Sequence, residues 1–139
     1  FIKDEKYEDY NFLITGSVGW KNEEVFKLIK DLNLENKVLF VGFVEDADLP
    51  HFYSAAKVLI YLSKYEGFGL PPVEAATCGT PSLLYANSSL KEIFKTGYPY
   101  TKKGDELETI EILINKHIEP KKYLNSYSWN DYINQFINL

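Results

Sequence analysis

Two glutamates flank a glycine- and proline-rich segment in the middle of the chain, and no other segment holds residue types so well suited to chemistry. Glu66 and Glu74 are separated by seven residues, the run Gly67–Leu70 followed by Pro71, Pro72 and Val73. Glycines let a backbone approach a ligand closely and adopt a positive φ. Prolines at a helix start remove N–H groups that the helix leaves unpaired anyway. The pattern therefore indicates a ligand-binding loop between a strand and a helix.

The helix that follows this loop is expected to span Val73–Cys78 and to end at Gly79. Aligned peptide dipoles and outward-pointing N–H groups make such a helix start favourable for a phosphate. We expect Glu74 in the first turn, where its ionised carboxylate can accept two hydrogen bonds from a vicinal diol such as a ribose. The same carboxylate could instead only complement the helix dipole.

The rest of the chain supplies the elements that must position this loop. Short apolar segments predict strands at Phe12–Thr15, Lys37–Val41, Lys57–Leu62 and Pro81–Tyr85, with an edge strand at Tyr98–Tyr100. Helices are expected after the capping residues Asn22, Asp48, Ser89 and Asp105, and an apolar stripe over Trp129–Ile137. This alternation predicts an α/β fold, a Rossmann-like parallel sheet with helices on both faces, as one domain over residues 1–139. Ligands of such sheets bind beyond the carboxyl ends of the strands.

Composition excludes several classes of function. The chain has 139 residues, with 20 acidic against 15 basic side chains and a formal charge of −5. A nucleic-acid-binding domain usually carries a basic face, so nucleic acid is not an expected partner. No apolar run approaches the roughly 20 residues of a membrane-spanning helix.

The few cysteine and histidine residues predict neither a disulfide nor a metal site. Cys78 is the single cysteine, which fits a reducing, cytoplasmic setting, and we expect it to be a small packed helix residue. His51 and His117 have no partners at ligand spacing. No metal and no cofactor are expected.

Two other kinds of protein share some of these features. A flavodoxin-like signalling or nucleotide-binding domain has this size and element order, but receivers need an aspartate at a strand end, where this chain has Gly16, Gly42 and Ser63. A glycoside hydrolase would need Glu66 and Glu74 as paired carboxylates about 5–9.5 Å apart across a scissile bond. The non-catalytic, flavodoxin-like domain is the alternative function that we consider for this chain.

The segment Tyr65–Pro81 closely resembles the donor-site signature of retaining glycosyltransferases of family 4, which have the GT-B fold. That signature consists of two glutamates separated by seven residues, a small-residue helix and Gly-Thr-Pro. The likeness extends from about Phe12 onward, and the other matching segments are Ile14–Ser17, Phe40–Val44, Leu49–Pro50, Tyr53–Ala56, Ser88–Glu92 and Tyr127–Trp129.

The resemblance implies a role for each matching residue. Glu66 would lie beside the donor sugar, as the catalytic carboxylate, and Glu74 would hold the ribose hydroxyls. The donor-binding positions that it implies are Ser17, Val44, Gly67, Phe68, Gly69, Leu70 and Glu74. Of these, the backbone of Phe68–Leu70 would meet the pyrophosphate and sugar, Val44 the nucleobase edge, and Ser17 the phosphate side.

The function implied is transfer of a hexose from a nucleoside-diphosphate sugar to a saccharide or lipid-linked acceptor in cell-surface glycan synthesis. Gly19-Trp20 and the double proline look most like mannosyltransferases, so GDP-mannose is expected before a UDP-sugar. The family's basic phosphate-binding pair has no counterpart, since Lys3 and Lys6 stand outside its motif. We therefore expect a fragment that lacks its N-terminal acceptor domain and is inactive alone. The whole enzyme could associate with the inner membrane face through that domain.

Overall fold

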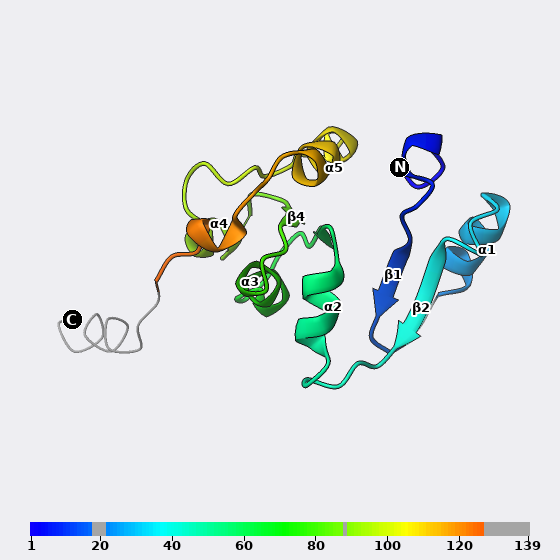
Figure 1. Cartoon of the computed structure of the whole chain (residues 1–139), viewed down its shortest axis with the longest axis horizontal. Helices are drawn as coiled ribbons and strands as arrows, with labels where there is room; N and C mark the ends of the chain where they lie inside the picture. Colours follow the sequence, from blue (N-terminus) through cyan, green and yellow to red (C-terminus); the bar gives the residue numbers. More distant parts are fainter. Residues whose placement is uncertain (18–21, 88, 127–139) are drawn as a thin grey trace. The chain divides into compact units, whose positions relative to one another are not determined.

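The computed structural model describes residues 1–17, 22–87 and 89–126, in two compact units, Phe1–Leu49 and Pro50–Leu139. Strands and helices alternate as far as Leu84, and both strand pairs of the described residues are parallel, so the predicted α/β class is confirmed. Within the described residues, the four strands pair two by two, β1 with β2 and β3 with β4 (Figure 1). The predicted stripe Trp129–Ile137 and the pair Gly19-Trp20 lie outside the described residues.

The first unit is a β–α–β segment. Its elements are η1 (Glu5–Tyr7), β1 (Phe12–Thr15), α1 (Glu23–Asp31) and β2 (Val38–Gly42). The two strands run in register from Phe12 opposite Val38, and the register shifts by one residue before Thr15 meets Gly42. The ring of Phe26 on α1 packs on the ring of Phe40, with centroids 4.7 Å apart. The sequence pattern predicts an inward-facing stripe of Val25, Leu28, Ile29 and Leu32 on this helix, and Phe26 lies outside it.

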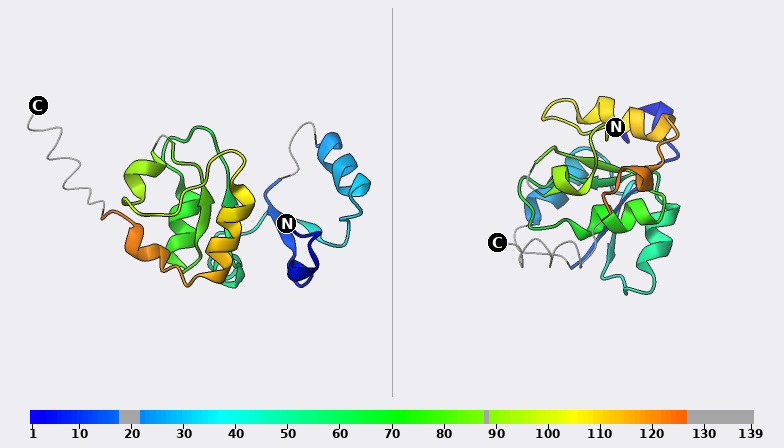
Figure 2. Two further views of the ribbon diagram at one scale, coloured as in Figure 1. Left: turned by 90° about the horizontal axis from the view of Figure 1, so that it is seen from above. Right: turned by 90° about the vertical axis from the view of Figure 1, so that its left-hand side faces the viewer.

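The second unit contains the glycine- and proline-rich loop. The elements from here on are α2 (Leu49–Ala55), β3 (Leu59–Tyr61), α3 (Leu70–Thr77), β4 (Ser82–Leu84), α4 (Leu90–Ile93), α5 (Glu106–Asn115) and η2 (Pro120–Tyr123). The helices α3 and α5 lie on opposite sides of β4 (Figures 1 and 2). The loop that follows β3 leaves the strand at its carboxyl end and leads directly into α3.

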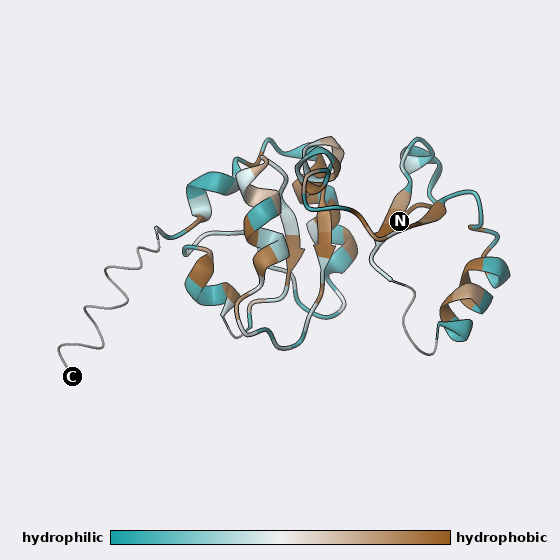
Figure 3. Ribbon diagram, turned by 90° about the horizontal axis from the view of Figure 1, so that it is seen from below, coloured by the Kyte–Doolittle hydropathy of each residue, from teal (hydrophilic) through white to brown (hydrophobic). Residues whose placement is uncertain are grey.

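Fully buried strand residues hold the second unit together. All of β4 is buried, and the strands are coloured as hydrophobic while the helices carry both hydrophobic and hydrophilic residues (Figure 3). The core cluster contains Ala76 of α3, Leu84 of β4, and Leu90, Ile93, Phe94 and Tyr98 from α4 and the turn after it. Burying side chains of this size contributes about 1.5–3 kcal/mol each. The core thus joins α3, which follows the loop, to α4.

The edge strand predicted at Tyr98–Tyr100 does not form. Tyr98 is only 4% exposed, and its hydroxyl donates to the Ser82 carbonyl (2.6 Å) and accepts from the Ser82 N–H (2.7 Å). The phenol thus takes both backbone groups that a neighbouring strand would pair. The backbone bonds to β4 only afterwards, where the Thr101 N–H donates to the Leu84 carbonyl over 2.8 Å and Thr101 forms a parallel bridge with Tyr85, the residue after β4.

Candidate donor-binding site

The loop between β3 and α3 has a conformation that requires glycine at one position. Gly69 is buried and has a φ of +88°. A Cβ added there would lie 2.7 Å from Cδ2 of the buried Leu90. The preceding Gly67 is exposed, and a Cβ there would meet nothing within 4 Å. Gly69 is therefore the glycine on which the path of the loop depends.

A hydroxyl from the start of α4 holds the loop from the other side. The Ser89 hydroxyl lies 3.1 Å from the carbonyl oxygen of Glu66 and 3.0 Å from that of Phe68, so its one proton is shared between them. Ser89 occupies the predicted cap position of α4, but its side chain makes no cap hydrogen bond. Ser89 and Glu92 have the spacing of a capping box, which predicts that the Ser89 side chain caps α4. This prediction is wrong, because the Ser89 hydroxyl bonds the loop carbonyls instead.

The helix α3 begins earlier than predicted. It starts at Leu70, with Gly69 as its N-cap and both prolines in its first turn. Proline is tolerated there because its fixed φ suits the helix and its missing N–H has no partner to lose. The prediction that Glu74 lies in the first turn is therefore wrong, since Glu74 lies in the second turn.

Two backbone amides at the start of α3 have no acceptor within the helix. The first four positions of a helix make no N–H bond inside it. Here two of these positions are prolines without an N–H, so only Gly69 and Leu70 carry such a free amide. Neither amide donates a hydrogen bond to any residue of the described ranges. Phe68 and Leu70, the aromatic and aliphatic side chains beside them, are 46% and 59% exposed.

Each of the two glutamates accepts a hydrogen bond from a tyrosine. The Tyr53 hydroxyl on α2 donates to Oε2 of the exposed Glu74 over 2.9 Å. Partial burial of Tyr53, together with the charge and hydrogen bond of Glu74, raises the pKa of its phenol. The Tyr61 hydroxyl at the end of β3 donates to the half-buried Glu66, and burial and this carboxylate raise the pKa of Tyr61 to about 12. Both phenols are protonated donors at neutral pH, and their raised pKa values keep them so above pH 10.

Neither tyrosine is among the site residues predicted from the sequence. Tyr53 belongs to the matching segment Tyr53–Ala56, and Tyr61 to the predicted strand Lys57–Leu62. A signal did exist for Tyr61, because a tyrosine that ends a strand stands at the sheet edge where the loop with Glu66 begins. For Tyr53 there was none, since its partner Glu74 is 21 residues further along the chain.

The predicted positions outside this loop belong to the first unit. Ser17 follows the end of β1 and is exposed, and Val44 follows β2 and is half-buried. Each lies beyond the carboxyl end of its strand, where the parallel-sheet rule expects a ligand. Their contribution to the same site as Glu66 and Glu74 stays a prediction.

The remaining reactive side chains do not gather into a site. Cys78 is half-buried directly after α3, and His51 and His117 are exposed. Within the described ranges, no group of three or more histidine, cysteine, aspartate or glutamate residues could hold a metal ion. Over the same residues, none of the helices has the length and apolar character needed to cross a membrane.

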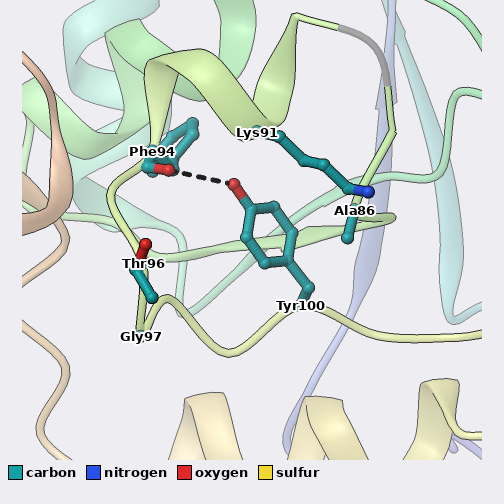
Figure 4. A pocket seen from close by; sticks show the side chains of 6 residues that line it. All are labelled: Ala86, Lys91, Phe94, Thr96, Gly97 and Tyr100. Carbon is teal, nitrogen blue, oxygen red and sulfur yellow. Dashed lines mark hydrogen bonds between the residues drawn. The ribbon is translucent and has the colours of Figure 1, made fainter.

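A separate cavity of about 400 Å³ opens next to α4 in the second unit (Figure 4). Its lining residues are Ala86, Lys91, Phe94, Thr96, Gly97 and Tyr100. The Tyr100 hydroxyl can donate to the carbonyl oxygen of Leu90 (2.8 Å), the first residue of α4, or to that of Phe94 (3.3 Å), which follows α4. This hydrogen bond holds Tyr100 against α4. Lys91 is the one charged residue of this lining.

Comparison with known proteins gives the family. A model of the family "Glycosyl transferases group 1" matches residues 2–132. The O-antigen chain mannosyltransferase B of Escherichia coli is 38% identical over 84 residues, which are 60% of this chain and 22% of that protein. The O-antigen chain mannosyltransferase RfbU of Salmonella typhimurium is 33% identical over 108 residues, 76% of this chain and 31% of that protein. The chain thus spans less than a third of these relatives.

Solved structures show the same fold. A mutant of TarM from S. aureus, in complex with Fondaparinux, alpha-GlcNAc-glycerol and UDP, matches with a TM-score of 0.76 at 20% identity, over 99% of this chain and 30% of that one. HepE of Anabaena in complex with UDP matches with a TM-score of 0.65 at 23% identity, over 93% and 41% of the two chains. These neighbours have the GT-B architecture that the resemblance implied. The chain belongs to the glycosyl transferases group 1 family.

Proposed function

We propose that the chain is the donor-binding part of a retaining family 4 glycosyltransferase that transfers a hexose from a nucleoside-diphosphate sugar. One observation carries the proposal: the amides of Gly69 and Leu70, without partners in the described ranges, stand at the start of the helix that also carries Glu74. Such amides suit phosphate oxygens, and a carboxylate on the same helix suits a ribose. The relatives' names support the same chemistry.

The loop binds the diphosphate through its backbone. The amides of Gly69 and Leu70 donate to phosphate oxygens, and the helix dipole of α3 adds a favourable field on a chain whose formal charge is −5. Gly67 and Phe68 bring the backbone close to the sugar hydroxyls. Charge that develops on the leaving phosphate is stabilised by donors already in position, which costs no reorganisation during the reaction.

The two glutamates divide the remaining work. Glu74 accepts hydrogen bonds from the ribose diol, and Glu66 lies beside the reacting carbon of the sugar and stabilises the positive charge that develops there. Ser17 faces the phosphates and Val44 the base. In the transfer, the acceptor oxygen forms a bond to the anomeric carbon while the bond from that carbon to the phosphate oxygen breaks. The nucleoside diphosphate leaves with the electron pair and takes up the proton of the acceptor hydroxyl.

The donor that we propose first is GDP-mannose. Two of the relatives are named mannosyltransferases of the O-antigen chain, and a further relative, from Agrobacterium fabrum, is named mannosylfructose-phosphate synthase (44% identical over 62 residues, 14% of that protein). A UDP-sugar is the second candidate, since HepE and TarM were solved with UDP. The acceptor is a saccharide or a lipid-linked saccharide, bound by an N-terminal domain. That domain could bring the enzyme to the inner face of the membrane.

Binding to the isolated chain tests the proposal. We expect GDP, UDP or ADP to bind weakly in calorimetry, and no binding of any of them at millimolar concentration would contradict the proposal. Glu74→Ala should weaken nucleotide binding more than binding of free pyrophosphate, because only the nucleotide carries the diol. Equal losses would refute the ribose role. Transfer activity is expected to require the acceptor domain, so turnover by these 139 residues alone would contradict that division of labour.

A further inference from the structure

We propose that Tyr53 is a positioning residue that holds the Glu74 carboxylate in the orientation needed to receive a ribose diol. The inference rests on the proposed function, since it assigns a supporting residue to the nucleotide site. Tyr53 comes from α2 and Glu74 from α3, so the contact joins two helices that are separated by β3 in the chain.

Two hydrogen bonds attach Tyr53 to α3 and its C-terminal turn. Its hydroxyl donates to Glu74 Oε2 over 2.9 Å. Its backbone carbonyl accepts a bond from the hydroxyl of Thr80, a residue 2% exposed that directly follows the turn ending α3. The Thr80 bond fixes the backbone of Tyr53 beside this segment, and the hydroxyl bond holds the phenol against Glu74.

Without this contact, Glu74 would be a mobile side chain. It lies in the second turn of α3 and is exposed, so no packing selects one of its rotamers. Immobilising such a flexible side chain on binding costs about 0.5–1.5 kcal/mol. The Tyr53 hydrogen bond orders the carboxylate before a ligand arrives. A ligand that binds to Glu74 therefore loses less free energy to immobilising this side chain.

The hydrogen bond leaves enough acceptor capacity for a diol. An ionised carboxylate has about four lone-pair sites, and Tyr53 uses one of them on Oε2. Within the part of the chain that the structure describes, Oε1 of Glu74 accepts no hydrogen bond. Two diol hydroxyls can therefore donate to Oε1 and to the second lone pair of Oε2 at the same time. The Tyr53 hydroxyl is protonated at neutral pH, and its raised pKa keeps it a donor above pH 10.

The test measures how strongly the chain distinguishes a ribose from a sugar without the diol. Dissociation constants for GDP and for 2′,3′-dideoxy-GDP are measured by NMR titration of the 139-residue chain and of each variant. We expect Tyr53→Phe to weaken GDP binding about two- to tenfold, the ratio that corresponds to ordering one flexible side chain. Binding of the dideoxy nucleotide should not change.

A matched control separates positioning from general damage. Tyr85 also donates its hydroxyl to a glutamate, Glu106 (2.6 Å), in the same unit but outside the loop. Tyr85→Phe should leave both dissociation constants unchanged. In a Glu74→Ala background, Tyr53→Phe should have no further effect on GDP binding, whereas a purely structural role would lower the affinity for both nucleotides and in both backgrounds.

The outcomes distinguish this inference from the proposed function. If the unaltered chain binds neither nucleotide, the proposed function fails and the inference falls with it. If Glu74→Ala reduces the preference for the diol but Tyr53→Phe does not, only the inference is overturned. If Tyr53→Phe does not fold, Glu74→Asp replaces it, because the shorter carboxylate keeps its charge but withdraws from the Tyr53 hydroxyl. A diol preference equal to that of the unaltered chain would then overturn the inference.

Discussion

The side chain of Leu90 occupies the space that a Cβ on Gly69 would need, with its Cδ2 atom 2.7 Å from that position. Leu90 is fully buried in the core cluster and begins α4, while Gly69 is the N-cap of α3. The loop thus passes directly over the core, and α4 shapes it twice, through this contact and through the Ser89 hydroxyl. The path of the loop and the packing of the core cannot change independently.

We therefore expect Gly69→Ala to destabilise the chain. The left-handed backbone at φ +88° costs a residue with a Cβ about 1–2 kcal/mol, and the clash with Leu90 adds to this. Gly79→Ala is the matched control, because Gly79 has a φ of +89° but a Cβ there meets nothing within 4 Å. Urea denaturation of both variants isolates the Leu90 contact. Equal free energies of unfolding for the two variants would contradict it.

Replacing Tyr98 by phenylalanine should lower stability through two orphaned backbone groups. The buried Tyr98 hydroxyl bonds both the N–H and the carbonyl of Ser82, which is itself fully buried. Leaving a buried group unsatisfied costs about 1–3 kcal/mol, so we expect a loss of about 2 kcal/mol or more. Tyr85→Phe, at a half-buried site, should cost less when both are measured by thermal unfolding. A loss at Tyr98 no larger than that at Tyr85 would show that Ser82 is satisfied in another way.

Stability should fall in strongly alkaline solution because tyrosines are held protonated by the fold. The pKa of Tyr61 is raised from 10.0 to about 12 by burial and by Glu66. The folded state therefore keeps its proton where the unfolded state loses it, and the stability present below pH 10 declines as the pH rises through about 12. Tyr61→Phe should make the decline shallower in unfolding curves collected between these pH values. An unchanged slope would mean that Tyr61 does not contribute to it.

Substituting Glu66 should affect transfer far more than nucleotide binding. In the complete enzyme, we expect Glu66→Gln to reduce kcat by about 100-fold or more, since it removes charge that stabilises the reacting carbon. The dissociation constant for the nucleoside diphosphate should change little, because Glu66 faces the sugar in our proposal. Glu106→Gln, which alters a glutamate outside the loop, is the control for steady-state kinetics and calorimetry. A proportionate loss in nucleotide affinity would place Glu66 at the nucleotide instead.

The element order was predictable because it depends on local patterns. Short apolar segments such as Phe12–Thr15 predict strands, and amphipathic segments predict helices, from their own residue pattern. In β1 the residues alternate between half-buried and exposed, so the pattern predicts the strand but not the burial of both its faces. The glycine- and proline-rich loop was predictable from a local pattern too, because its residue types restrict the backbone by themselves. The sequence also predicted its place between a strand and a helix, which the structure confirms.

Two of the wrong predictions concern side chains that have a distant partner. Ser89 has the spacing of a capping residue, but its hydroxyl bonds loop carbonyls more than 20 residues earlier in the chain. Tyr98 has the surroundings of an edge strand, but its phenol satisfies Ser82. The start of α3 was misplaced for a local reason, because proline is compatible with both a loop and a first helical turn. Neither the Tyr53 nor the Tyr61 contact follows from spacing alone.

The two prolines in the first turn of α3 have a consequence for kinetics. Proline fixes φ near −65°, so the turn that carries the Gly69 and Leu70 amides is held in one shape before any ligand is present. We therefore expect association to be governed by diffusion and electrostatic approach, with no slow rearrangement of the loop. Differences in affinity among nucleotides would then be found in their residence times.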